Sequence, residues 1–188
     1  MRGQREAWHA SLADVPADKL VFVDESGAKT DMTRLYGWGE AGERVVDPVP
    51  RGHWKTCTML AAARLGGPLA AVTIDAAVDA DAFVVWAREV LAPCLSPGDV
   101  VVMDNLPAHK VPGVAEAIGA AGAGVRYLPP YSPDYNPIEN MWSKVKAHLR
   151  AAAARTFDAL GDAIDRALAS VTPADCRGFF GHCGYPAT

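Results

Sequence analysis

The sequence lacks the features of membrane and secreted proteins. Its longest apolar stretches fall well short of the roughly 20 residues that a membrane-spanning helix needs, and no positively charged start followed by an apolar core opens the chain. Its four cysteines form no closely spaced pair, which argues against a disulfide scaffold and against a zinc site. These absences predict a cytoplasmic protein with reduced thiols and no membrane partner.

Positive charge is also scarce. The 18 lysines and arginines are outnumbered by 22 aspartates and glutamates, and the net charge is −4. Because domains that bind nucleic acids are usually basic, this balance argues mildly against DNA as a partner. A local patch can nevertheless bind a polyanion where the average charge does not. Basic residues gather in two clusters, at Arg51, His53 and Lys55 and at Lys144, Lys146, His148 and Arg150.

What the chain does contain is typical of one folded domain of 188 residues, half of them hydrophobic. Apolar runs and turn residues predict strands over 20–24, 55–64, 69–74, 100–104 and 125–128, with a further short strand over 44–46. Helical periodicity and capping residues predict helices over 4–14, 79–91, 111–121, 136–154 and 156–171. This order indicates an α/β fold, with a mixed five-stranded sheet (three antiparallel strands, then alternating α and β), helices on both faces and a C-terminal helical tail.

Two of the predicted strands end in an aspartate, at Asp24 and Asp104. A short apolar run is typical of a strand buried on both faces of a sheet, where an ionised side chain is costly unless a cation or hydrogen bonds compensate it. Neighbouring strands of an open α/β sheet share one crevice at their carboxyl ends, so the two aspartates can converge although residues 25–103 separate them. Their hard oxygen atoms suit Mg²⁺ or Mn²⁺.

The predicted helix over 136–154 contributes a third acid, Glu139. Asn136 is a suitable N-cap for this helix, and Pro137 is a suitable first residue. Apolar residues then recur at helical spacing, so this stripe should pack on the sheet with Glu139 beside it. The stripe consists of Ile138, Trp142, Val145 and Leu149.

Glu139 begins a polar stripe that continues with Ser143, Lys146 and Arg150. An anionic polymer could lie along this stripe while its reacting phosphate meets the acid. The alternative is an ordinary solvated face with a glutamate favoured by the helix dipole. The three carboxylates together favour the first reading, because two metal ions roughly 4 Å apart can activate a water or a 3′-hydroxyl and stabilise the leaving oxygen of a phosphodiester.

The surroundings of the three acids resemble those of a known family. They are Phe22-Val23-Asp24-Glu25-Ser26, then Met103-Asp104-Asn105 with His109, then Tyr131-Ser132-Pro133-Asp134-Tyr135-Asn136-Pro137-Ile138-Glu139-Asn140 with Trp142 and Lys146. These segments are similar to DDE-type transposases of the mariner superfamily, in its bacterial insertion-sequence branch. The 34 residues between Asp104 and Glu139, 105–138, are a spacing typical of that group. The resemblance covers residues 20–149.

The resemblance implies an RNase H-like fold that cuts and joins DNA with Mg²⁺ or Mn²⁺, using two ions. By this likeness Asp24, Asp104 and Glu139 are the catalytic and metal-binding residues. We therefore expect a helical stub over 1–19, an RNase H-like DDE catalytic domain over 20–154, and a helical tail over 155–188 that packs on the same domain. The expected DNA contacts are His109, Lys144, Lys146, Arg150, Arg51 and Lys55.

Several neighbouring residues have open roles. Glu25 should face the opposite side of its strand from Asp24, in a structural role. His109 matches a family motif and could orient phosphate or water, or it could be a capping or packing residue. Asn136 should shape the helix start rather than touch substrate. Trp38 could stack on bases or anchor the core or a loop.

Members of this family carry N-terminal helix-turn-helix modules that recognise element ends, whereas 19 residues precede the first predicted strand here. The module would then come from a separate or frameshift-fused polypeptide, or the chain is a fragment of a decayed mobile element. DNA, as element ends and target, is the expected partner, in association with the nucleoid. A homodimer is also expected, since pairing two ends needs two active sites.

The sequence thus predicts metal-dependent cleavage at the ends of an insertion sequence, followed by attack of the freed 3′-hydroxyl on target DNA. Two alternatives stay open. One is an RNase H-like nuclease without strand transfer, and the other is a non-catalytic remnant that binds DNA and regulates a full transposase.

Overall fold

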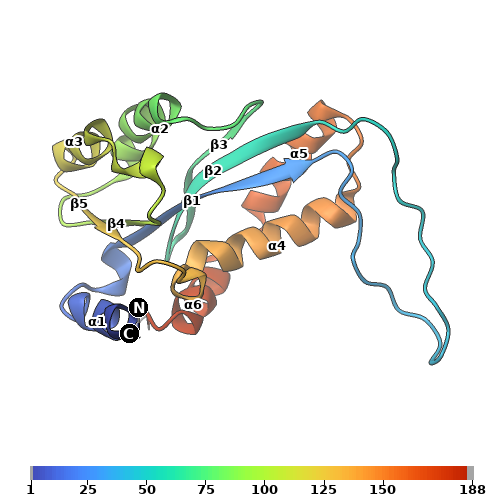
Figure 1. Cartoon of the computed structure of the whole chain (residues 1–188), viewed down its shortest axis with the longest axis horizontal. Coiled ribbons are helices and arrows are strands. Elements are labelled where there is room, and N and C mark those ends of the chain that lie inside the picture. Colours follow the sequence, from blue (N-terminus) through green and yellow to red (C-terminus); the bar gives the residue numbers. More distant parts are fainter. Residues whose placement is uncertain (1, 186–188) are drawn as a thin grey trace.

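A five-stranded sheet lies at the centre of the computed structural model, which describes residues 2–185 (Figure 1). The strands are β1 (Leu20–Lys29), β2 (Thr56–Arg64), β3 (Gly67–Ile74), β4 (Val100–Met103) and β5 (Gly124–Tyr127), in the order β3-β2-β1-β4-β5. The first three are antiparallel, whereas β4 and β5 run parallel to β1. The predicted mixed sheet is confirmed. Residue 1 and residues 186–188, the ends of the predicted stub and tail, lie outside the described part.

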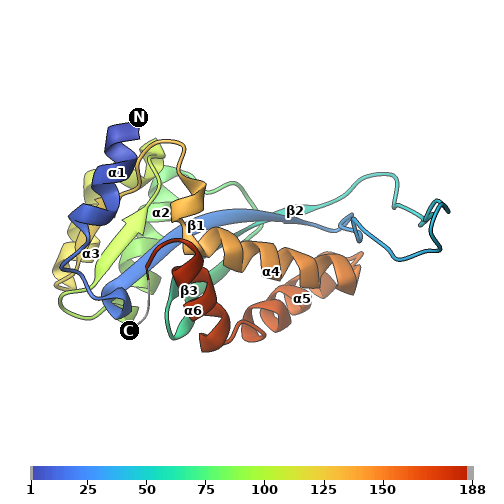
Figure 2. The same ribbon diagram turned by 90° about the horizontal axis from the view of Figure 1, so that it is seen from below.

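The central strand β1 explains why its first residues are all apolar. Leu20 and Phe22 belong to the hydrophobic core on one face of the sheet, and Val21 and Val23 belong to the core on the other. All four are buried, because a layer of helices covers each face. One layer holds α2 (Ala80–Trp86) and α3 (Pro112–Ala120). The other holds α1 (Arg2–Ser11), α4 (Pro137–Ala152), α5 (Phe157–Ala169) and α6 (Pro173–His182), of which Figure 2 shows α4, α5 and α6 together on one side of β1.

The predicted apolar stripe of α4 faces the sheet: Ile138, Trp142, Val145 and Leu149 are all buried. Helix α5 matches its prediction closely, but α6 was not predicted as a separate helix. A capping box between Thr172 and Asp175 starts it. Leu160 of α5 and Phe180 of α6 lie in the same hydrophobic core as β1, so the C-terminal residues share their core with the sheet.

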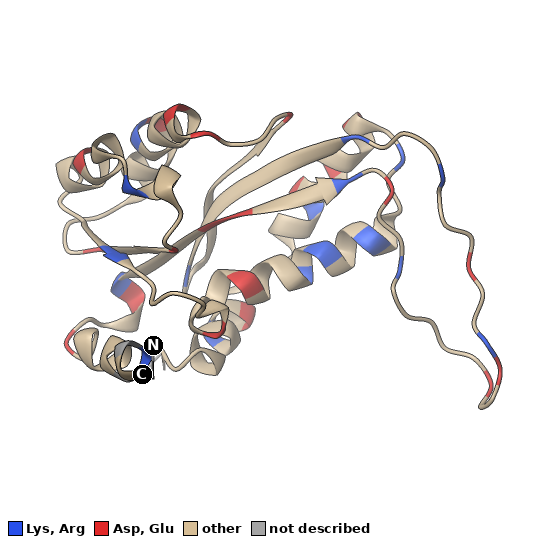
Figure 3. Ribbon diagram, viewed as in Figure 1, with Lys and Arg blue, Asp and Glu red and all other residues tan. Residues whose placement is uncertain are grey.

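The segment 30–55, called the arm below, joins β1 to β2 without forming a helix or strand (Figures 1 and 2). The short strand predicted over 44–46 is therefore wrong. Its residues are exposed and no neighbouring strand pairs with them, so the apolar side chains there gain no burial. Charged residues of both signs lie along the arm (Figure 3). Trp38 is fully exposed on it and anchors no core.

Three smaller observations complete the fold. The helix predicted over 79–91 changes after Trp86 into a π-helical turn, η2 (Ala87–Leu91). Within residues 2–185, no helix combines the length and the apolar character needed to cross a membrane. All four cysteines are free thiols, as predicted.

We predict that Leu160→Ala lowers the free energy of unfolding by about 2–5 kcal/mol, because Leu160 is 1% exposed and its removal leaves a cavity in the shared core. The matched control is Leu35→Ala on the arm, where the leucine is 64% exposed; its effect should stay within about 0.5 kcal/mol. Urea unfolding measures both. A Leu160→Ala protein as stable as the control would show that the tail does not fold with the sheet.

Candidate active site

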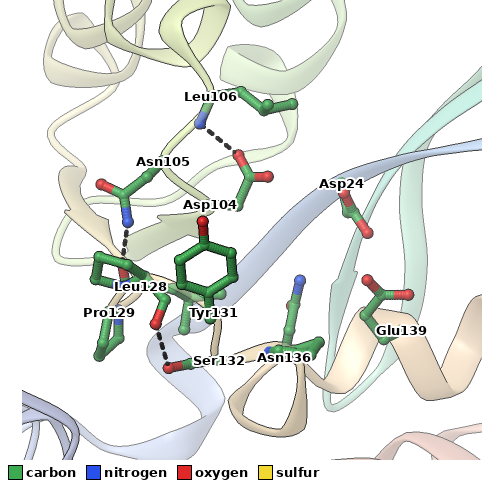
Figure 4. A pocket seen from close by; sticks show the side chains of 12 residues that line it. Asp24, Asp104, Asn105, Leu106, Leu128, Pro129, Tyr131, Ser132, Asn136 and Glu139 are labelled. Atoms are coloured by element: carbon green, nitrogen blue, oxygen red, sulfur yellow. Dashed lines mark hydrogen bonds between the residues drawn. The ribbon is translucent and has the colours of Figure 1, made fainter. Parts of the chain in front are cut away.

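The pairing of β1 with β4 brings the two aspartates together. Leu20 lies beside Val100 and Phe22 beside Val102 in this parallel ladder, so two residues further the same register leads to Asp24 and Asp104. Partner residues of parallel strands point to the same face, here the face that carries α4. Glu139 stands in the first turn of α4. All three carboxylates line one cavity of about 450 Å³ (Figure 4).

Asp24 and Glu139 point toward each other across this cavity, from β1 and α4 (Figure 4). Burial, and after it the negative charge of Glu139, raise the pKa of Asp24 to about 8. The ionised form of Asp24 is unfavourable in this position unless a cation lies next to it; without a cation, the protonated form is favoured. The metal-binding role of the pair stays a prediction.

Asp104 has different surroundings. Its side chain is 40% exposed, and its Oδ1 accepts a hydrogen bond from the Leu106 backbone N–H at 2.9 Å. Burial alone would raise its pKa, but the contacts with His109 and Leu106 hold the pKa below the ordinary value. Asp104 is thus ionised. Within residues 2–185, no three His, Cys, Asp or Glu side chains lie close enough to form a metal-binding group, so the acids share a cavity without forming a closed cluster.

His109 links Asp104 to Glu25. Its Nε2 lies 3.1 Å from both carboxylate oxygens of Glu25. Its Nδ1 lies 2.8 Å from Oδ1 of Asp104 but is not aligned for a hydrogen bond, so this contact is an ion pair. Although burial lowers the pKa of His109, the two carboxylates raise it to about 9, and both ring nitrogens carry protons at neutral pH.

This arrangement answers the open roles of both residues. Glu25 faces away from Asp24, into the core of α2 and α3, where it holds His109. The His109 ring is fully buried and packs on Phe83, with 4.3 Å between the ring centroids. It lines neither the cavity nor the surface, so the expected direct contact of His109 with DNA does not fit the structure. Its contacts are with Glu25, Asp104 and Phe83.

The other expected DNA contacts lie on α4 and the arm. The Lys144 ammonium forms an ion pair with Asp175 of α6 at 2.5 Å, which leaves Lys144 less available for contact with DNA. Lys146 and Arg150 are half-buried and form no ion pair within residues 2–185. Arg51 is exposed at the base of the arm, and the Lys55 ammonium lies 5.6 Å from the centre of the Phe157 ring. Figure 3 shows basic residues along α4 beyond its first turn.

One residue that shapes the cavity escaped the sequence analysis. Arg5 of α1 forms hydrogen bonds with the Tyr131 carbonyl at 3.2 Å and with Ser132 Oγ at 2.9 Å. It also pairs with both carboxylate oxygens of Asp134 and stacks over the Tyr135 ring. These contacts hold the segment 129–136 that forms one wall of the cavity. No motif could reveal them, because more than a hundred residues separate Arg5 from its partners.

The sequence model of a family described as DDE superfamily endonuclease matches residues 19–161, which include all three acids. The chain belongs to this family. A search of the curated proteins gives no match for this DDE endonuclease chain.

Solved structures resemble the DDE endonuclease chain in fold. The Mos1 strand transfer complex has a TM-score of 0.73 at 15% identity, over 97% of this chain and 56% of that one. The Mos1 paired-end complex with the left transposon end has a TM-score of 0.71 at 14% identity, over 96% and 57%. The catalytic domain of Mos1 mariner transposase gives 0.67 at 13%, over 97% and 85%. The expected RNase H-like fold is confirmed, and the chain spans just over half the length of the first two.

We predict that Asp24→Asn is more stable than the native chain in metal-free buffer at about pH 8. The pKa of Asp24 rises from 3.8 to about 8 on folding, so the native state holds a proton that the unfolded chain has released. Stability therefore falls as the pH rises through this window. The advantage of the variant should grow by about 1.4 kcal/mol for each pH unit of this window, reach several kcal/mol at its upper end and vanish near pH 4.

Thermal unfolding with a chelator present measures this difference, and Asp47→Asn on the exposed arm is the matched control. Equal melting temperatures of the native chain and Asp24→Asn at every pH would show that Asp24 carries no unfavourable charge.

Proposed function

We propose that this DDE endonuclease chain is the catalytic domain of a transposase, which cuts DNA at the ends of a mobile element and joins the freed 3′-hydroxyl to target DNA. The observation that carries the proposal is the half-buried Asp24 carboxylate facing Glu139 in a cavity that Asp104 also lines. The likeness in fold to Mos1 supports it, since the Mos1 structures include a paired-end complex and a strand transfer complex.

The residues of the cavity fit divalent metal ions. Its charged lining consists of carboxylates, and the raised pKa of Asp24 indicates a place where a cation is favourable. Mos1 paired-end complexes are described with Mn and with Mg. Two ions, as the family implies, would activate the attacking water or 3′-hydroxyl and stabilise the leaving oxygen. Asp24 and Glu139 would hold them from one side and Asp104 from the other.

The chain's own residues fix the geometry of this reaction. Asp24 is rigid because buried residues of β1 precede it. Glu139 is fixed by the first turn of α4, whose buried stripe packs on the sheet. His109, itself held by Glu25 and packed on Phe83, would keep Asp104 ionised and fix its side chain in place just after β4. Removing a residue that holds a metal ligand in this way typically lowers metal affinity or activity by about 10–100-fold.

DNA would run from the cavity along α4 toward the base of the arm. Lys146 and Arg150 follow Glu139 along α4, and Arg51 and Lys55 of the arm would continue this path. Recognition of element ends by a helix-turn-helix module on a separate or fused polypeptide stays a prediction, as do a homodimer that pairs two ends and association with the nucleoid. The finer choice of Mg²⁺ as the working ion is likewise a prediction.

We expect Asp104→Asn and Glu139→Gln to lose on the order of a thousandfold in activity, because each removes a ligand that stabilises the reacting oxygens. The assays are Mn²⁺-dependent nicking of a supercoiled plasmid and joining of an oligonucleotide with a free 3′-hydroxyl to that plasmid. Glu40→Gln on the exposed arm is the control and should keep full activity.

The same assays separate the alternatives. Nicking without joined product, in the native chain, would identify a nuclease rather than a transposase. DNA binding without nicking or joining would identify a non-catalytic remnant. If Asp104→Asn nicks as fast as the native chain, the proposed site is wrong.

For the proposed DNA path we predict that Arg150→Ala reduces the slope of log Kd against log salt concentration by about 1, the value for one lost phosphate contact. Arg88→Ala is the matched control, because Arg88 lies on the other face of the sheet and is paired with Glu89. Fluorescence anisotropy of a labelled duplex measures both slopes. Equal slopes for the native chain and Arg150→Ala would show that Arg150 of α4 makes no phosphate contact and would contradict the proposed DNA path.

A further inference from the structure

The three acids make up only part of the cavity lining. The rest, called the apolar end below, consists mainly of apolar side chains, with Asn105, Ser132 and Asn136 among them; the apolar residues are Leu106, Leu128, Pro129, Pro130, Tyr131 and Pro133. Metal ions and a phosphate group gain nothing from an apolar wall. At about 450 Å³ the cavity falls within the range of sites that enclose small molecules. The apolar end is therefore suited to a flat, largely apolar group with a polar edge.

Tyr131 stands at the mouth of this apolar end (Figure 4). Its side chain is 85% exposed, and its φ of 54° lies in the left-handed region, which an aromatic residue rarely adopts. The contacts of Arg5 with the Tyr131 carbonyl, Ser132 and Asp134 hold this conformation. Backbone strain that the surroundings fix in this way is typical of functional sites. The structure thus presents an aromatic face beside the acids.

Asn136 supplies a polar group that lacks a partner. It is 3% exposed, and among the described residues nothing hydrogen-bonds to its Oδ1. It occupies the N-cap position of α4 as predicted, but its side chain makes no capping hydrogen bond. Instead the amide points into the cavity, between Tyr131 and the pair of Asp24 and Glu139 (Figure 4). The expectation that Asn136 serves only the helix start is therefore incomplete.

Two other uncharged polar side chains of the cavity, Asn105 and Ser132, already have partners. Asn105 donates to the Leu128 carbonyl and accepts from the Lys110 ammonium at 2.7 Å. Ser132 Oγ accepts from Arg5 and donates to the Pro130 carbonyl at 3.3 Å. A buried amide oxygen that stays unpaired is costly, and the Asn136 amide nitrogen, which points into the cavity (Figure 4), offers a donor to an incoming group. Asn136 is thus the group that a ligand in this cavity would satisfy.

We propose that the apolar end of the cavity binds an unpaired nucleobase of the DNA strand next to the scissile phosphate, with the base stacked on Tyr131 and its edge hydrogen-bonded by Asn136. This inference rests on the proposed function, which places the phosphate at the acids. A base has a flat π-face for the tyrosine ring and a donor and acceptor edge for the amide. A paired base inside a duplex presents neither to such a cavity, so the base must leave the stack.

The test compares two DNA probes in Ca²⁺ buffer, which should support binding but poorly support cleavage because its coordination shell is larger and looser. Each probe is a duplex with a short single-stranded tail, and the tail nucleotide next to the duplex carries adenine in one probe and no base in the other. The native chain should bind the adenine probe about fivefold or more tightly, the contribution of one stacked base. Fluorescence anisotropy with the full chain gives both dissociation constants.

Tyr131→Ala should bind the two probes equally, and Tyr131→Phe should keep the preference because it keeps the ring. Asn136→Ala should reduce the preference. Tyr36→Ala is the matched control, since Tyr36 is 91% exposed on the arm, and it should bind like the native chain. Because Tyr131 is also exposed, thermal unfolding should show a native melting temperature for its variants.

The inference is overturned if the native chain binds the two probes equally, if Tyr131→Ala keeps the preference, or if Tyr36→Ala loses it. Plasmid nicking by the native chain in Mn²⁺ is scored separately. A preference for adenine without nicking would support the base pocket and contradict the proposal that the chain is a transposase. Nicking without the preference would remove the base pocket alone.

Discussion

The parallel pairing of β1 with β4 is the constraint on which the candidate site depends. It places Asp24 and Asp104 at the same end of neighbouring strands. Helix α4 packs on one face of the sheet and adds Glu139. Burial of Leu20 to Val23 on both sides fixes the register, because a shift of one residue would turn Asp24 away from α4. The apolar core and the acidic site are thus specified by the same strand.

The surroundings of Asp24 and Asp104 shift their pKa values in opposite directions. Asp24 is half-buried and faces Glu139, so its ionised form is disfavoured, whereas the protonated His109 and the Leu106 amide favour ionised Asp104. The fold therefore contains one acid that needs a cation and another that is ready to bind it. Such local conflict between stability and charge is typical of functional sites.

Segments from both ends of the chain support the cavity wall. Arg5 of α1 holds the segment 129–136 from one side. Tyr185 accepts a hydrogen bond from Trp8 and donates one to the Tyr135 carbonyl, which ties the C-terminal segment and α1 to the same wall. Residues far outside the three acidic motifs thus position Tyr131 and Asn136. The wall is rigid because contacts of high sequence separation converge on it.

The sequence by itself determined the five strands, the buried stripe of α4 and the choice of the three acids, because apolar periodicity, caps and motifs are local properties of the chain. The capping box at Thr172 is a further local signal, which marks the start of α6. Only the tertiary structure decided that the arm forms no strand, that His109 is buried between Glu25 and Asp104, that Arg5 holds the cavity wall, and that Asn136 stays unpaired. These outcomes depend on which distant residues meet, and no local pattern specifies such a contact.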